Sequence, residues 1–169
     1  EHTDVAIDPH QSIHAMVYII QGVGQLLGRI GIEVVHNDTD VPFLTSDNPV
    51  IWFDPSLPEA EMRPYTVRPD GPITLMFPVA PDLMIYGDTL KQKQFAQHGV
   101  IYSRPNGVAA VETMNALVCR FAYDTVFASQ SGFSKLVKEH AGASPVIRTE
   151  TIPAPKGQYL LHQSVWGRR

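Results

Sequence analysis

The sequence of 169 residues contains one cysteine, Cys119, so no disulfide bond can form within the chain. Only 18% of its residues are charged, which is too few for a charged disordered tail. Its longest apolar stretch, Ile13 to Ile30, contains His14, Arg29 and several glycines, and is poor material for a membrane span. These absences exclude a disulfide scaffold, a disordered chain and a membrane channel. A hydrophobic content of 44% instead predicts a folded core.

The lone thiol and the charge distribution bear on the surroundings of the protein. A single cysteine fits a reducing compartment, so we expect a soluble, cytoplasmic protein. The net charge is −4, and residues 1–61 are acidic whereas residues 62–169 are basic on balance. An acidic chain has no broad attraction for phosphate backbones, so nucleic acid is not indicated as a partner.

The hydrophobic patterns predict a single α+β domain over residues 1–169. Its expected core is a mostly antiparallel sheet of four or five strands, with two long helices and one short helix. The expected strands cover residues 31–36, 42–45, 50–53, 73–77 and 83–86. The expected helices cover residues 9–29, 106–128 and 134–140, and the tail adds a final hairpin or an edge strand.

Two segments depart from these patterns. Residues 54–72 are rich in proline and poor in apolar residues, which predicts a long surface loop and the best candidate for disorder in the chain. The first helix contains Gly22, Gly24 and Gly28, each of which weakens a helix by about 1 kcal/mol relative to alanine. We expect another backbone to pack closely against these glycines.

The segment Thr45-Ser-Asp-Asn-Pro49, here called the elbow, places short polar side chains where two apolar runs must turn. A carboxylate at Asp47, with Ser46 and Asn48 beside it, is suited to orient water, bind a metal ion or act as a general base. The alternative is an Asx turn, in which Asp47 and Asn48 satisfy backbone N–H groups.

Asn115 lies on the apolar stripe of the second long helix and is therefore expected to be buried. A buried amide is costly unless it is paired, and we expect the Ser46 to Asn48 turn to be its partner. Asn115 would serve there as a structural clamp or as support for a site.

Other motifs are weaker. His10 and His14 are four residues apart, and Asp8 and His36 could complete a metal site with them, but the set lacks the glutamate of zinc protease helices. The glycines of the first helix do not follow a strand, which argues against dinucleotide binding. Cys119 lies on a packed helix face, which predicts an inert thiol. No cofactor is indicated.

Three segments in order carry a family resemblance: Phe43-Leu-Thr-Ser-Asp-Asn-Pro-Val50, Met76-Phe-Pro-Val-Ala-Pro-Asp82, and Asn115 with Ala122 and Tyr123. Together they resemble the bacterial domain-of-unknown-function family 4238 over about residues 10–130. Members usually have a further N-terminal portion with a His-Tyr-Val-Pro type motif, which is absent here, so the chain resembles the C-terminal part of the family pattern. The missing portion of the same protein is then a possible partner, and the resemblance implies no known activity.

Two hypotheses follow. The first is a hydrolase, with a phosphoester as the candidate substrate, in which Asp47 binds a metal or positions water and Ser46, Asn48 and Asn115 orient it. The second is a binding or regulatory module without chemistry, in which the same four residues lock the sheet and the proline-rich loop contacts a partner. The missing nucleophile and the acidic balance favour the second.

Overall fold

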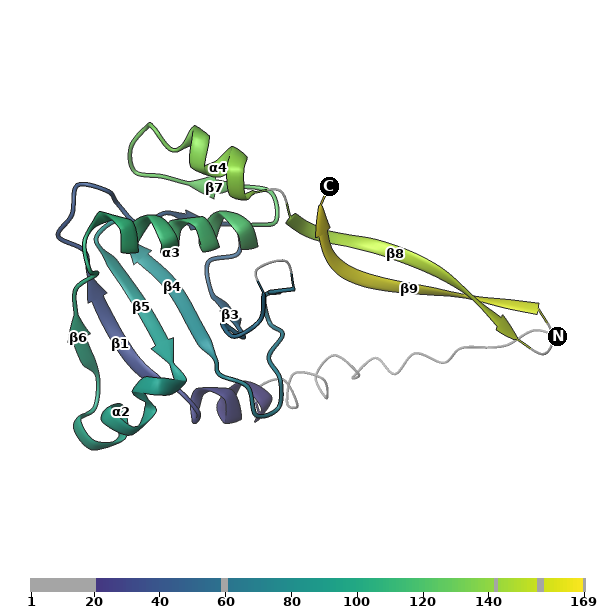
Figure 1. Cartoon of the computed structure of the whole chain (residues 1–169), viewed down its shortest axis with the longest axis horizontal. Coiled ribbons are helices and arrows are strands. Elements are labelled where there is room, and N and C mark those ends of the chain that lie inside the picture. The colour runs from purple at the N-terminus through teal and green to yellow at the C-terminus, as the bar shows by residue number, and fades with distance from the viewer. Residues whose placement is uncertain (1–20, 59–60, 142, 155–156, 169) are drawn as a thin grey trace, which may run out of the picture.

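The computed structural model describes residues 21–58, 61–141, 143–154 and 157–168, and its main body is a mixed five-stranded sheet (Figure 1). The strands run in the order β3-β4-β5-β1-β6. Their bounds are β1 Gly31–His36, β3 Ile51–Phe53, β4 Thr74–Ala80, β5 Leu83–Asp88 and β6 Ile101–Ser103. The pairs of β3 with β4, β4 with β5 and β5 with β1 are antiparallel, whereas β1 and β6 are parallel. The expected α+β class is confirmed, and the sheet is mixed.

The parallel strand β6 and the helical segment before it were not predicted from the sequence. A 3-10 turn, η1 (Thr89–Lys91), and helix α2 (Gln92–His98) connect β5 to β6. Neither of these helical elements has a fully buried residue, so the segment lacks the apolar period that identifies an amphipathic helix. Strand β5 is antiparallel to β1 and β6 is parallel to it, so β5 ends at the end of the sheet where β6 begins. The helical segment therefore carries the chain past the start of β1, which lies between the two strands.

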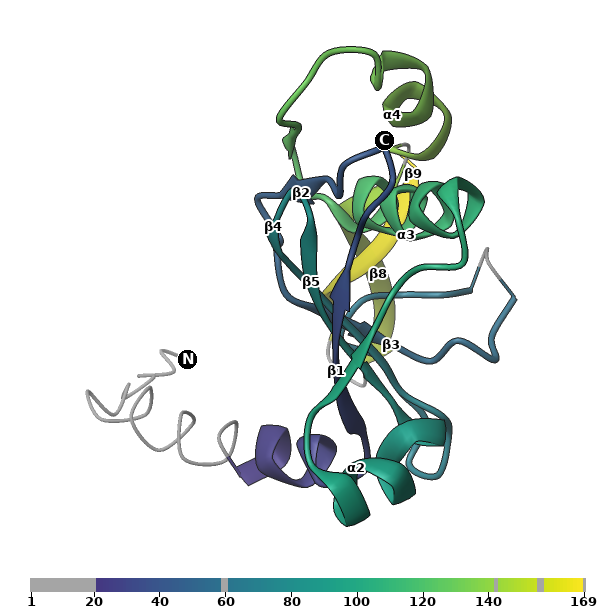
Figure 2. The same ribbon diagram turned by 90° about the vertical axis from the view of Figure 1, so that its left-hand side faces the viewer.

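Helix α3 (Val108–Phe121) lies across one face of the sheet, as Figure 2 shows from the side. The core that it forms with this face consists of apolar side chains from the helix, from the strands and from the segment before β2. Among its buried members are Phe43, Leu44, Ile51, Phe53, Met76, Met84, Val111, Val118, Cys119 and Phe121. The sequence predicted this helix through residue 128, which is wrong, because the backbone leaves the helix at Ala122 with a ψ of 141°.

The first long helix is described only in part. Residues 21–27 are helical, and the rest of the segment predicted over 9–29 lies mostly outside the described residues. A side chain added at Gly22 or Gly24 would meet no described atom within 4 Å, and one at Gly28 would meet only carbonyl oxygens of the same helix. The expected close approach of another backbone is therefore not found. Such an approach occurs instead at Gly31, where a Cβ atom would collide with the backbone of Lys91.

Three smaller elements complete the described chain. Strands β2 (Thr45–Ser46) and β7 (Val126–Phe127) pair with each other beside α3, and helix α4 (Ser134–His140) has the bounds that the sequence predicted. Strands β8 (Ala143–Ala154) and β9 (Gly157–Arg168) form a hairpin that projects from the domain (Figure 1), which confirms the expected final hairpin. Within the described ranges, no helix has the length and apolarity needed to cross a membrane.

Candidate functional site

The turn at the elbow is stabilised by local hydrogen bonds of the Ser46 side chain. The Ser46 hydroxyl accepts a hydrogen bond from the backbone N–H of Asn48 at 3.1 Å and donates to the Asn48 carbonyl at 3.0 Å. Strand β2 holds Ser46 opposite Val126 of β7. Both Ser46 and Asn48 are buried, so these short contacts satisfy polar groups that would otherwise lose their hydration.

The Asp47 carboxylate binds the backbone that follows helix α3. Its Oδ1 atom accepts from the N–H of Tyr123 at 2.9 Å, and its Oδ2 atom accepts from the N–H groups of Asp124 and Thr125 at 2.8 and 3.3 Å. The backbone N–H of Asp47 donates to the Thr125 carbonyl at 3.1 Å. The carboxylate therefore fixes the residues at which the chain leaves the helix. This long-range contact is structural, but it differs from the local Asx turn that was the alternative for Asp47.

Asn48 holds the end of the same helix. Its side-chain amide donates to the Phe121 carbonyl at 3.0 Å, and its Oδ1 atom accepts from the Tyr65 hydroxyl. The Tyr65 hydroxyl also donates to the Val50 carbonyl, at 2.8 Å. Burial raises the pKa of Tyr65, which keeps this hydroxyl protonated as a donor. Phe121 is the last residue of α3, so Asn48 satisfies one of the carbonyl groups that a helix end leaves open.

Asn115 is fully buried, as predicted, but its expected partner was wrong. Its Oδ1 atom accepts from the Leu44 N–H at 2.8 Å, and its amide donates to the Pro42 carbonyl, also at 2.8 Å. These backbone groups precede the elbow. Asn115 therefore holds the segment that leads into the elbow, whereas Asn48 holds the last residue of the helix and Asp47 holds the backbone just after it. We call these contacts of residues 42–48 with α3 and with residues 123–125 after it the helix clamp.

Of the four residues in the histidine-based metal hypothesis, the structure describes only His36. Asp8, His10 and His14 lie outside the described residues. His36 is exposed and lies 3.7 Å from Asp82 between Nε2 and Oδ2. In the part of the chain that the structure describes, no group of three or more His, Cys, Asp or Glu side chains is arranged to hold a metal ion.

Sequence reasoning missed a cleft of about 1000 Å³ bounded by α3, α4, the sheet face and the loop after β3. This volume lies at the upper end of the range that small-molecule sites occupy. Its apolar walls include Val41, Phe53, Met62, Leu117, Phe133 and Leu136. Its polar lining includes Thr74, Tyr86, Glu112, Arg120, Lys135 and Glu139.

The hydroxyl groups of the cleft lie on adjacent strands. Tyr86 is opposite Met76 in the pairing of β4 with β5, and Thr74 is two residues before Met76, so all three side chains share the sheet face that α3 covers. Burial is the main cause that raises the pKa of Tyr86; a hydrogen bond with Thr74 acts against it, and the nearby carboxylates of Asp88 and Glu33 add to it. Tyr86 therefore offers a neutral hydroxyl to the cleft at ordinary pH.

One signal in the sequence could have revealed this cleft. Ala109, Thr113, Ala116 and Arg120 recur at three- and four-residue spacing on α3, beside the stripe that is buried in the core. Small residues on such a second stripe leave room between a helix and its neighbours. Without the position of α4, however, the sequence pattern does not distinguish this stripe from an ordinary solvent-facing side of a helix.

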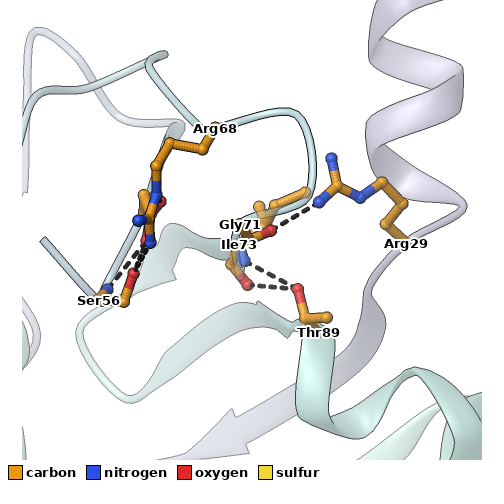
Figure 3. A network of polar contacts seen from close by, with 7 residues as sticks. Arg29, Ser56, Arg68, Gly71, Ile73 and Thr89 are labelled. Atoms are coloured by element: carbon orange, nitrogen blue, oxygen red, sulfur yellow. Dashed lines mark hydrogen bonds and ion pairs between the residues drawn. The ribbon is translucent and has the colours of Figure 1, made fainter.

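A network of hydrogen bonds holds the proline-rich loop in place (Figure 3). The fully buried Asp54 carboxylate accepts from the Arg68 Nε atom at 2.7 Å and from the Ser56 N–H at 3.0 Å. Arg68 also donates to the Ser56 hydroxyl, and Arg29 donates to the Gly71 carbonyl at 2.6 Å. The hydrogen bond from Arg68 lowers the pKa of Asp54 to about 2.

These contacts change the expectation for residues 54–72. The segment was the best candidate for disorder, yet its described residues are held at Asp54, Arg68 and Gly71, and the Tyr65 backbone N–H donates to the Trp52 carbonyl at 2.7 Å. Phe53 and Pro55, on either side of Asp54, both line the cleft. The network therefore positions one wall of the cleft.

Comparisons with known proteins place the chain in a family. No curated protein and no solved structure gives a significant match. The sequence profile of a family described as protein of unknown function (DUF4238) matches residues 1–132, which include the elbow, helix α3 and all five strands of the main sheet. Because this match covers well over half of the chain, the protein belongs to the DUF4238 family.

Proposed function

We propose that this chain is a binding module without chemistry at the elbow, and that the cleft between α3 and α4 takes an uncharged, mainly apolar small molecule. The observation that carries this proposal is the contrast between the two places. The Asp47 and Asn115 side chains are engaged by backbone groups of the chain itself, whereas the cleft offers about 1000 Å³ of space with apolar walls.

The charges of the cleft support an uncharged ligand. Glu112 and Glu139 on its lining are balanced by Arg120 and Lys135, so the field does not select an ion of either sign. The Thr74 and Tyr86 side chains offer hydroxyl groups, which orient a ligand by hydrogen bonds. Apolar walls with a few such polar groups are typical of sites for small, largely apolar molecules.

A fluorescence titration tests this proposal. N-phenyl-1-naphthylamine, an uncharged apolar fluorophore, should bind the full chain saturably and with increased emission. Ala116→Trp places a large ring in the cleft from α3 and should abolish the saturable signal. Ala96→Trp adds the same ring on the exposed surface of α2 and is the matched control. Equal binding by both variants, or no saturable binding by the parent chain, would refute the proposal.

The hydrolase hypothesis is the second candidate, and its only support is the polar character of the elbow. It requires a reacting group to reach a carboxylate whose two oxygens already accept three backbone hydrogen bonds. Hydrolysis of p-nitrophenyl phosphate that disappears in Asp47→Asn, with an unchanged unfolding midpoint, would favour this hypothesis over the binding module. No turnover by the parent chain would count against it.

A further inference from the structure

The β8–β9 hairpin is a sheet of two strands, and no other described strand joins it. Each strand has twelve residues, and the hairpin projects from the domain (Figure 1). It also lies beyond the residues matched by the family, which end at 132. A long two-stranded hairpin leaves a row of unpaired backbone N–H and C=O groups on each outer edge, and such edges recruit further strands.

Prolines obstruct the outer edge of β8. Pro145 is opposite Trp166 and Pro153 is opposite Gln158 within an unbroken register. The two prolines are eight positions apart, an even spacing, so both nitrogen atoms point to the same side of the strand. A proline cannot donate to its neighbour, so that side is the outer edge of β8. An incoming strand would find donors missing near both ends of this edge.

The outer edge of β9 has no such obstruction. In an antiparallel pair, the backbone groups of two residues directly opposite each other both face the partner strand or both face away from it. The residues opposite the outward-facing positions of β8 therefore also face outward, and they include Gln158, Leu160 and His162. Strand β9 contains no proline, and its one charged residue, Arg168, stands at its end. It therefore lacks the charges and prolines with which edge strands ordinarily prevent pairing.

The apolar side chains of β9 lie where an added strand would meet them. Tyr159 is 68% exposed and Leu160 is 62% exposed, although both types of side chain are favoured in the interior of sheets. Leu161 is exposed too, and Ile152 of β8, opposite Tyr159, continues the apolar surface on the same face. An added strand with apolar residues at matching positions would cover these side chains.

We propose that β9 pairs antiparallel with β9 of a second copy of this chain, with Leu160 opposite its own counterpart. In this register Tyr159 of one copy is opposite Leu161 of the other, so each of the exposed apolar side chains gains an apolar cross-strand neighbour. Residues 157–163 contain no Asp, Glu, Lys or Arg, so no like charges are brought together. The pairing has two-fold symmetry and is closed, and it joins two hairpins into one four-stranded sheet.

Sedimentation equilibrium of the full chain tests the dimer. The mass should rise with concentration from 18.7 kDa toward twice that value. Leu160→Pro removes an outward donor from β9 and should keep the chain monomeric at concentrations where the parent is dimeric. Thr151→Pro is the matched control, because Thr151 is opposite Leu160 and its N–H faces outward from β8. This variant should still dimerise. A parent chain that stays at 18.7 kDa throughout, or a dimer lost only in Thr151→Pro, overturns the proposal.

A second pair of variants guards against loss of the hairpin fold. Leu160→Lys opposes two charges at the symmetry axis and should weaken the dimer, whereas Thr151→Lys should not. The register is tested by Leu160→Cys, which should form an intermolecular disulfide on mild oxidation, while Thr151→Cys and the parent chain should not. A dimer that survives Leu160→Lys, or that fails to cross-link through Leu160→Cys, overturns the pairing of β9 with itself in this register.

Discussion

Asp47 and Thr125 are joined by two hydrogen bonds: the Asp47 N–H donates to the Thr125 carbonyl at 3.1 Å, and the Asp47 Oδ2 atom accepts from the Thr125 N–H at 3.3 Å. The elbow and the segment after α3 are thus paired through both backbone and side chain. The same carboxylate binds the N–H groups of Tyr123 and Asp124. Its position explains why the helix does not continue to residue 128, as its apolar spacing predicted.

Removing the carboxylate should therefore cost stability. We expect Asp47→Ala to lower the free energy of unfolding by about 1–3 kcal/mol, because three backbone donors lose a charged acceptor. The free energy of unfolding of Asp47→Asn should fall between those of the parent and Asp47→Ala, since one amide oxygen replaces two carboxylate oxygens. Urea denaturation followed by circular dichroism measures the effect. The exposed Asp70→Ala is the control and should change the midpoint little. An unchanged midpoint in Asp47→Ala would contradict the structural role.

Asn115 gives a second prediction, in the core. Asn115→Ala leaves the Leu44 N–H and the Pro42 carbonyl without their partner in a buried environment, which should cost about 2–4 kcal/mol. Asn115→Asp keeps an acceptor for Leu44 but loses the donor to Pro42 and places a carboxyl group in the core, so it should also destabilise. The exposed Asn106→Ala is the control. Urea denaturation of all three variants decides the matter, and a loss no larger than that of the control would refute the clamp.

The Cys119 thiol gives a third prediction, through its reactivity. It is fully buried, and burial raises its pKa to about 11, so the reactive thiolate is scarce at pH 8. We expect Ellman's reagent to leave the native chain almost unmodified and to react with one thiol per chain once urea unfolds it. Fast modification of the native protein at pH 8 would show that this part of the core opens readily.

The buried side of the fold was largely predictable, because apolar spacing reports burial directly. Helix α4, strand β1 and the burial of Asn115 followed from spacing alone. The partner of Asn115 did not, since periodicity says which side of a helix is buried and not which backbone group lies opposite. A shift of two residues, from Ser46 at the start of the expected turn to Leu44, separates the expected contact from the observed one.

The candidate cleft and the loop network were beyond such reasoning. The cleft depends on the position of α4 relative to α3, which no local pattern encodes. Asp54 follows the apolar strand β3 and begins a proline-rich segment, so its burial depends on a guanidinium fourteen residues away in the sequence. Long-range polar pairs of this kind carry no periodic signal, and composition alone therefore suggested disorder.

The Asp54–Arg68 pair should make stability depend on pH. The pKa of Asp54 is lowered from 3.8 to about 2, first through the hydrogen bond from Arg68, so the folded state binds this proton less readily than the unfolded chain. The resulting stabilisation is complete above about pH 4 and is lost as the pH falls from 3.8 toward 2. Arg68→Met leaves a buried carboxylate without its cation, so the variant should be clearly less stable than the parent at pH 7.

The difference between parent and Arg68→Met should then shrink on acidification, because a protonated Asp54 no longer needs the guanidinium. Urea midpoints measured from pH 7 down to pH 2.5 test this convergence. Arg63→Met, which removes an exposed arginine of the same loop, is the matched control and should follow the parent at every pH. A gap between parent and Arg68→Met that stays constant with pH would mean that Arg68 stabilises the loop by packing and not through the Asp54 charge.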